Sequence, residues 1–92
     1  MEFFKSTDLY GPPDDKGNSK LIKRDVITKI DIPVEDIYRV EEAIGHKGNI
    51  MKNKCVIIVS QNQIPILINH KYQDTVTKIN ESRYKSLSLI HI

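Results

Sequence analysis

The middle of this chain reads KCVIIVSQNQIPILINHKYQDTVTKI, from residue 54 to residue 79. It contains two short apolar runs, 55–59 and 64–68, separated by a polar segment. β-Branched residues dominate the first run, which favours a strand over a short buried helix. Two such runs joined by a short polar segment predict a β-hairpin, with Pro65 at the beginning of its second strand or on an edge.

A helical pattern follows the hairpin. Tyr72, Val76 and Ile79 recur at i, i+4 and i+7, so a short helix is expected to pack one apolar stripe on the sheet. One stripe covers only one sheet face, whereas the hairpin is apolar on both faces. Each aliphatic side chain left in water forfeits roughly 1.5–3 kcal/mol. The candidate interaction surface on the uncovered face is Val56, Ile58 and Leu67. We expect the loop 11–19, a second copy of the chain or another protein to cover it.

Three further strands are expected upstream of the hairpin. Residues 2–9 and 20–32 have the composition of strands, and Pro33 ends the second of them. The Gly- and Pro-rich segment 10–19 is expected to be a long exposed loop. The segment 37–44 fits two patterns, because its apolar residues recur at helical spacing while alternate residues also share one face of a strand. The local spacing slightly favours a helix, but the resemblance described below requires a strand there, and a strand is predicted.

The composition is that of one small cytoplasmic domain. The 92 residues are 39% hydrophobic and 28% charged, as in ordinary globular proteins, and a net charge of +2 does not by itself indicate nucleic acid or membrane. The single cysteine, Cys55, excludes an intrachain disulfide and fits a reducing cytoplasm. No apolar run reaches the roughly 18 residues of a membrane span, and the N-terminus lacks the pattern of a signal peptide.

The last residues of the chain look foreign to it. Residues 87–92 can be encoded by CTG TCT CTT ATA CAC ATC, a transposon end used in sequencing libraries. The segment 86–92 is therefore interpreted as a non-native tail, a translated adaptor from metagenomic sequencing, which leaves 1–85 as the single domain. The alternative is a genuine apolar tail or edge strand.

The order of elements from 26 to 79 resembles the small FlbD-like (swarming-motility, SwrD-like) family of short bacterial and phage proteins. The residues that carry the resemblance are IPVEDIYRVEE at 32–42, the runs 55–60 and 64–69, and the helical segment 72–79. Members run as a strand, a polar corner leading into an Ile-x-x-Val/Ile-Glu strand, a β-hairpin and a short C-terminal helix. Here Gln61 to Gln63 replaces the usual turn glycine, and the loop 45–53 is longer. The resemblance implies an accessory, non-enzymatic protein.

No group of residues predicts catalysis, a cofactor or a metal site. His46, His70 and Cys55 do not stand at metal-ligand spacing, and Cys55 alternates into a sheet face, where a free cysteine behaves as a small hydrophobe. A nucleophilic Cys55 beside His70 would need an exposed, electropositive setting. The acidic residues between 35 and 42 are interpreted as a solvated face rather than an acid–base pair. We therefore expect a protein that is not an enzyme.

A second class of function depends on basic residues. The candidate basic patch is Lys47, Lys52 and Lys54. Another basic group lies at 20–24, and Tyr10 and Tyr38 offer rings for stacking on bases. Twelve acidic residues offset fourteen basic ones, so ordinary solubilising charge explains the pattern better.

The sequence thus predicts an α+β domain, a small antiparallel sheet of four to five strands with one C-terminal helix packed on one face. Its expected function is that of a non-enzymatic interaction module, self-associating or binding another protein. The alternative is a small nucleic-acid-binding regulatory protein, and no membrane partner is expected.

Overall fold

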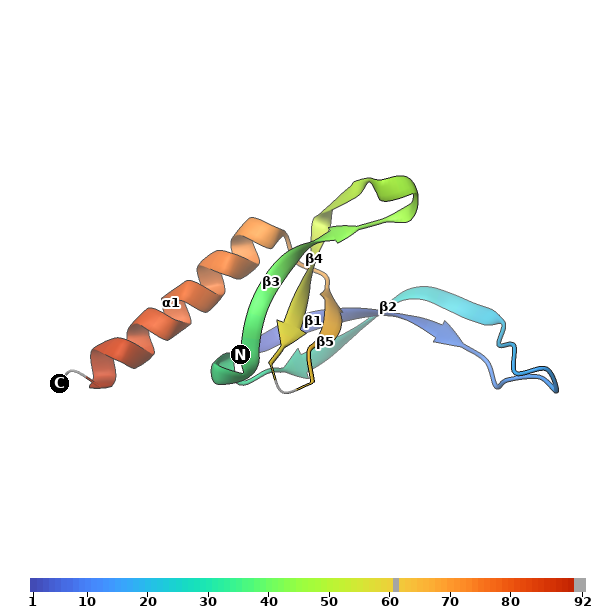
Figure 1. The fold of residues 1–92 in the computed structure, drawn as a ribbon, viewed down its shortest axis with the longest axis horizontal. Coiled ribbons are helices and arrows are strands. Elements are labelled where there is room, and N and C mark those ends of the chain that lie inside the picture. Colours follow the sequence, from blue (N-terminus) through green and yellow to red (C-terminus); the bar gives the residue numbers. More distant parts are fainter. Residues whose placement is uncertain (61, 91–92) are drawn as a thin grey trace.

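The computed structural model describes residues 1–60 and 62–90, and for helix residues 86–90 it describes the backbone only. The fold is α+β, a five-stranded antiparallel sheet with one C-terminal helix, which confirms the predicted class (Figure 1). The elements in chain order are β1 (Glu2–Tyr10), β2 (Leu21–Asp31), the 3-10 turn η1 (Val34–Asp36), β3 (Ile37–Ile44), the 3-10 turn η2 (His46–Gly48), β4 (Ile50–Val59), β5 (Ile64–Ile68) and α1 (Tyr72–Ile90). The strand order β2-β1-β5-β4-β3 places β2 and β3 at the two edges.

The predicted hairpin is present, with its expected faces. β4 and β5 pair antiparallel from Cys55 opposite Ile68 to Val59 opposite Ile64. Alternate residues of the two strands therefore share a face, and α1 packs on the face that carries Cys55 and Ile57. Ile57 and Ile68 are 0% exposed and form the centre of the core.

The helix contributes an apolar residue and a polar residue to this core. Ile79 of the predicted stripe is buried, while Tyr72 and Val76 are partly buried beside it. Thr75, outside the predicted stripe, is also buried, and its hydroxyl accepts a hydrogen bond from the Cys55 thiol at 3.3 Å. Burial raises the pKa of the Cys55 thiol, so the thiol stays neutral and weakly nucleophilic.

The segment 37–44, which fitted two patterns, is a strand. β3 pairs with β4 from Ile37 opposite Val59, and Val40 lies opposite Ile57. A neighbouring strand supplies hydrogen-bond partners and packing that the isolated segment lacks, and this tertiary context outweighs its helical spacing. The corner before it is the 3-10 turn η1, in which the Asp36 N–H donates to the carbonyl of Pro33.

Two elements are longer than predicted. β4 begins at Ile50, because pairing of Ile44 with Ile50 continues the β3–β4 ribbon past the polar residues 52–54. Helix α1 continues beyond residue 79, and in the added turns Arg83 donates a 2.5 Å hydrogen bond to the carbonyl of Ile37. The predicted non-native tail comprises residues 86–92. The side chains of 86–90 and all of residues 91–92 lie outside the described part of the chain, so the foreign origin of this segment stays a prediction.

A narrow seam joins the two halves of the sheet. β1 pairs with β5 at Lys5 opposite Ile68, and the N–H of Asn69 donates to the carbonyl of Phe4 at 2.7 Å. The N–H of Asn69 points toward β1. Backbone N atoms at every second residue point to the same side of a strand, so the N of Pro65 also points toward that side, where β1 no longer pairs with β5. Pro65 is the second residue of β5, the central strand of the sheet, so the prediction that it lies at the beginning of its strand is confirmed.

Beyond the seam, two ribbons of two strands each project from the body of the molecule (Figure 1). The N-terminal arm comprises residues 6–27, where β1 and β2 pair with each other, and it ends in the loop 11–20. The middle arm comprises residues 43–54, where β4 extends past β5 and pairs with β3. A two-stranded ribbon is marginally stable in water unless a third element packs on it.

The loop 11–19, one of the three covers expected for the second sheet face, lies at the far end of the N-terminal arm (Figure 1). It is ordered locally, because the Asp14 side chain accepts hydrogen bonds from the N–H groups of Lys16 and Asn18. All residues from 12 to 19 are exposed. The loop therefore does not cover β4 and β5.

The arms make the molecule extended for its size. Its radius of gyration is 16.0 Å and it measures 60 × 26 × 20 Å. A compact domain of this length has a radius of gyration of about 12 Å. The accessible surface is 7230 Å², whereas a compact monomer of the same mass exposes about 5,500 Å². The chain thus leaves far more surface in water than a typical folded monomer.

Candidate interaction cleft

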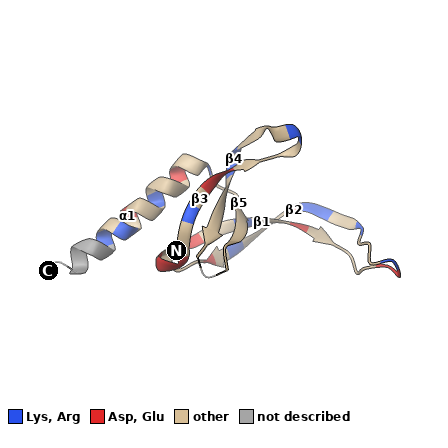
Figure 2. Ribbon diagram, in the orientation of Figure 1, with Lys and Arg blue, Asp and Glu red and all other residues tan. Residues whose placement is uncertain are grey.

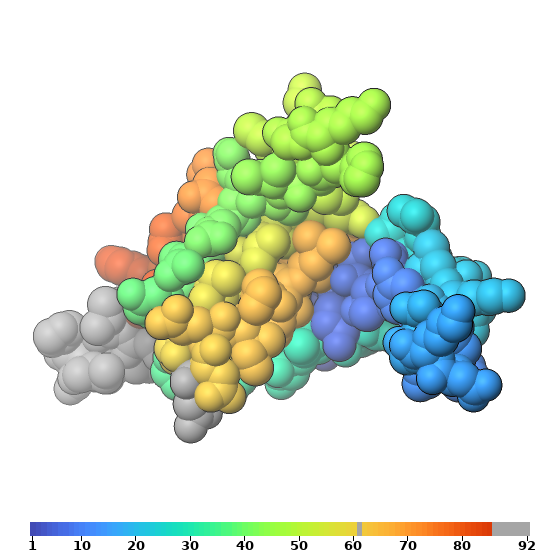
Figure 3. Space-filling model, turned by 45° about the vertical axis from the view of Figure 1, so that its right-hand side comes forward, coloured from blue at the N-terminus to red at the C-terminus, as the bar shows by residue number. Residues whose placement is uncertain are grey.

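The two arms and β5 bound an open cleft of about 930 Å³. One wall is the N-terminal arm, the opposite wall is the middle arm near Gly45, His46 and Met51, and the floor is β5 at residues 64–67. In Figure 3 the cleft lies between the yellow-green end of the middle arm and the blue end of the N-terminal arm, with orange β5 between them. A space of this size is at the upper end of the range for ligand pockets and accommodates several side chains.

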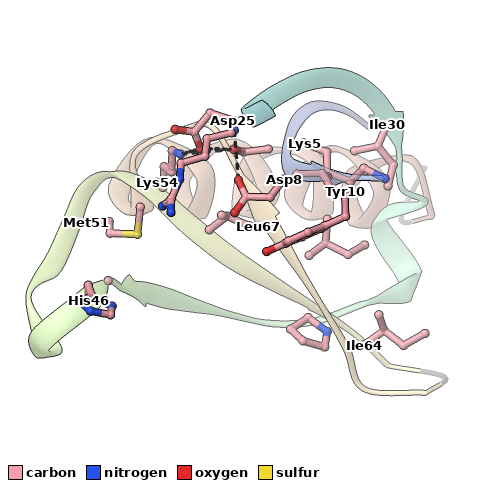
Figure 4. A pocket seen from close by; sticks show the side chains of 16 residues that line it. Lys5, Asp8, Tyr10, Asp25, Ile30, His46, Met51, Lys54, Ile64 and Leu67 are labelled. Carbon is pink, nitrogen blue, oxygen red and sulfur yellow. Dashed lines mark hydrogen bonds and ion pairs between the residues drawn. The ribbon is translucent and has the colours of Figure 1, made fainter. Parts of the chain in front are cut away.

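The lining of the cleft is mixed, with polar and charged side chains on its walls and apolar side chains on its floor. Tyr10 from the N-terminal arm, Ile64 and Leu67 from β5, and Met51 from the middle arm line it (Figure 4). Tyr10 and Ile64 are more than half exposed, so they stand in water in the isolated chain. Exposed aromatic and aliphatic side chains gathered in a concave surface are typical of protein-binding sites.

A polar clamp holds the two arms together at the base of the cleft. Lys54 of β4 forms an ion pair with Asp25 of β2, and Ser6 of β1 lies between them. The Ser6 hydroxyl donates to Asp25 at 2.9 Å, and the Lys54 ammonium also donates to Ser6 at 3.3 Å. The Lys54 side chain is only 13% exposed and Ser6 is buried, so the clamp excludes water on one side. These bonds fix the angle between the arms.

A β-bulge places Asp25 in this clamp. The β1–β2 register shifts between Thr7 opposite Val26 and Leu9 opposite Lys23, so that two residues of β2 face one of β1. Asp25 occupies the bulge with φ +53°, a left-handed conformation that Asp tolerates better than most residues. Its N–H is satisfied by the carboxylate of Asp8 at 3.2 Å.

The clamp should make stability depend on pH. Hydrogen bonds from Lys54 and Ser6, with the charge of Lys54, lower the pKa of Asp25. A carboxyl whose pKa is lower in the folded state adds stability above its unfolded pKa of about 4, and the contribution is lost as the pH falls through the folded pKa. At neutral pH, Asp25→Asn is therefore expected to unfold at lower urea concentration than the wild type, and the difference should shrink in acid.

Urea titrations at several pH values test this expectation, with Asp15→Asn in the exposed loop as the matched control. The control should differ little from the wild type at every pH. High salt should also narrow the Asp25→Asn difference at neutral pH, because the Asp25 side chain is largely exposed. A difference that stays constant from neutral to acidic pH would show that the ion pair does not stabilise the arms.

The three residues of the predicted interaction surface differ in their exposure and in whether they reach the cleft. Leu67 lines the cleft and is partly exposed, and Val56 is also partly exposed. Ile58 is only 5% exposed, although it lies on the face away from the helix. Of the predicted set, Leu67 is the member that the structure brings into the cleft.

The structure brings together two members of the predicted basic patch. Lys52 and Lys54 line one shallow pocket, whereas Lys47 lies in the turn of the middle arm, and the ammonium of Lys54 is paired with Asp25. In Figure 2, basic segments also occur on the helix, on β2 and at the tip of the middle arm. An ammonium already paired within the chain is poorly placed to neutralise a phosphate. The structure therefore gives the nucleic-acid alternative no specific support.

The three residues considered for metal binding or nucleophilic catalysis lie apart. His46 is in the η2 turn at the cleft, and Cys55 is in the core. The ring of His70 lies 5.8 Å from the ring of Phe4, and its Nε2 accepts a hydrogen bond from the backbone N–H of Phe4. In the described part of the chain, no three His, Cys, Asp or Glu side chains gather as a metal ion would require. Nor does any helix in that part have the length and apolarity needed to cross a membrane.

Comparison with protein-family models, with curated proteins and with solved structures found no match for this chain. The resemblance to the FlbD-like family therefore stays a prediction. The fold class depends on the architecture described above, and the function must be argued from the arms and the cleft.

Proposed function

We propose that this protein is a non-enzymatic interaction module that associates with a second copy of itself in the cytoplasm. The observation that supports the proposal is the area of exposed surface. The chain has 7230 Å² accessible to water, roughly 1,700 Å² more than a compact monomer of its mass. A standard specific interface buries about 800 Å² on each partner, and obligate homodimers bury more. The excess is therefore larger than the area that one partner contributes to a standard interface.

The position of the exposed apolar side chains supports the same proposal. Most of them lie on the arms and on the neighbouring end of β5, namely Leu9, Tyr10, Leu21, Ile22, Ile27, Ile44, Ile50 and Ile64, while Phe4, Tyr38 and Tyr84 lie elsewhere. Each arm is a two-stranded ribbon that lacks a covering layer, which isolated ribbons need for stability. An interface through the arms would supply that layer. An accessory role of this kind is also what the FlbD-like resemblance implies.

Sedimentation equilibrium of the full chain at micromolar concentrations tests the proposal. We expect a dimer, with a dissociation constant that raised salt changes little, since the exposed patch is mainly apolar. A monomer at every concentration, with circular dichroism showing folded protein, would refute self-association.

A further inference from the structure

We infer that the cleft of each chain receives the N-terminal arm of a second copy, so that the two molecules interlock reciprocally. The inference rests on the proposed self-association and names the surfaces that carry it. It follows from the juxtaposition, in one chain, of an uncovered ribbon and an unfilled cleft.

The N-terminal arm carries apolar side chains on both of its faces. Tyr10 pairs with Leu21, so these two share one face, and Tyr10 lines the chain's own cleft. The side chain of Ile22 lies over Gly11, which alternates with Tyr10 and therefore belongs to the opposite face. Ile22 is among the most exposed isoleucines of the chain. A ribbon with both faces apolar is suited to insertion between two surfaces rather than to lying on one.

Within its mixed lining, the cleft offers an apolar floor that the chain's own arm does not cover. Its floor is Ile64 and Leu67, and Met51 lies on the far wall. The clamp between Asp25 and Lys54 holds the N-terminal arm in place as one wall of the cleft. An arm fixed as a wall cannot also occupy the space, so the occupant must come from outside the chain.

A second copy satisfies both needs with one interface. When the arm of each chain enters the cleft of the other, the same patch is used on both chains, which gives a closed two-fold dimer. Each arm then gains the third layer that it lacks, and each cleft is filled. The surface required is about 800 Å² per chain for a standard interface, less than the excess found here.

Cross-linking between two variants, each with one added cysteine, tests the inference. Leu21→Cys chains, isotopically labelled, are mixed with unlabelled Ile64→Cys chains and treated with a short bis-maleimide. Native Cys55 is buried and its thiol pKa is raised, so it contributes little background. We expect a mixed-mass cross-linked dimer as the main product, because Leu21 lies on the arm that enters the other chain's cleft, and Ile64 is part of the floor of that cleft.

The matched control replaces Leu21→Cys with Tyr84→Cys, which places the thiol on an exposed position of the helix, away from the cleft. The control mixture is expected to cross-link at least tenfold less. Tyr10→Cys, on the same face of the arm as Leu21, serves as a second variant should Leu21→Cys fold poorly.

The outcomes separate the inference from the proposed function. A wild-type dimer with no preference for the arm–cleft pair over the Tyr84→Cys control would overturn the interlocked arrangement and leave self-association through another surface. A wild-type monomer in sedimentation would overturn both. Efficient cross-linking of the arm–cleft pair between chains would support both.

Discussion

Replacing Ile57 with alanine is expected to lower the free energy of unfolding by about 2–5 kcal/mol. Ile57 is fully buried at the centre of the β4–β5 hairpin, beneath the helix. Removing its outer methyl and methylene groups loses their transfer free energy and leaves a cavity that the rigid sheet cannot close. A domain of this length has only about 5–14 kcal/mol in total. The variant should therefore be close to the limit of folding.

Ile44→Ala is the matched control, because Ile44 lies on the neighbouring strand β3 but is 71% exposed. Its effect should be within about 0.5 kcal/mol in the monomer. Urea unfolding of both variants, followed by circular dichroism below the dissociation constant of the dimer, measures the difference. Equal effects of the two substitutions would mean that the core does not lie between the hairpin and the helix.

Tyr10→Lys is expected to weaken self-association roughly thirtyfold or more, as hot-spot aromatic residues do when removed from an interface. The Tyr10 ring is 55% exposed in the cleft, so the folded monomer should tolerate the lysine. In the interlocked dimer, by contrast, the substitution removes the ring from the interface and encloses an ammonium that stood in water in the monomer, at a cost in free energy.

Tyr84→Lys on the helix, where the tyrosine is 73% exposed, is the matched control and should leave the dissociation constant within a factor of about three. Sedimentation equilibrium measures both variants, and circular dichroism verifies that both are folded. Equal dissociation constants for the two variants would exclude Tyr10 from the interface and contradict the docking of the arm.

The sequence was a good guide where the pattern was local. The alternation in the two apolar runs predicted the faces of the hairpin, and the observed pairing of Cys55 with Ile68 agrees with it. Pro65 was correctly placed at the beginning of its strand, because its missing N–H restricts where it can lie in any sheet. The assignment of 37–44 needed the resemblance, since its spacing alone slightly favoured a helix.

The cleft depended on contacts between distant residues, which the sequence does not display. Lys54 was predicted as part of a basic patch, yet a bulge in β2 turns Asp25 toward it and makes it part of the clamp. The left-handed backbone conformation of Asp25 could not be predicted from the sequence, since aspartate occurs in many backbone conformations and no neighbouring pattern marks this one. Thr75 was also overlooked, because it is polar, although its spacing from Tyr72 and Ile79 places it on the same face of the helix.

The faces of the hairpin could be predicted and the cleft could not, for one physical reason. Side-chain periodicity reports which face of an element is buried, and it needs only neighbouring residues. The divergence of β1 from β5 depends on how far two strands remain paired, which is set by twist and bulges rather than by composition. The arms were therefore beyond what the pattern could predict.

The narrow seam between β1 and β5 has a consequence for the synthesis of this protein on the ribosome. β1 and β2 emerge first, but their attachment to the rest of the sheet needs Ile68 and Asn69, close to the last helix. Until those residues leave the exit tunnel, the nascent hairpin has no neighbouring strand to hold it. A chain truncated before Ile68 should therefore lack the strand that pairs with β1, and its first hairpin would be connected to β4 through the Asp25–Lys54 clamp rather than through the sheet.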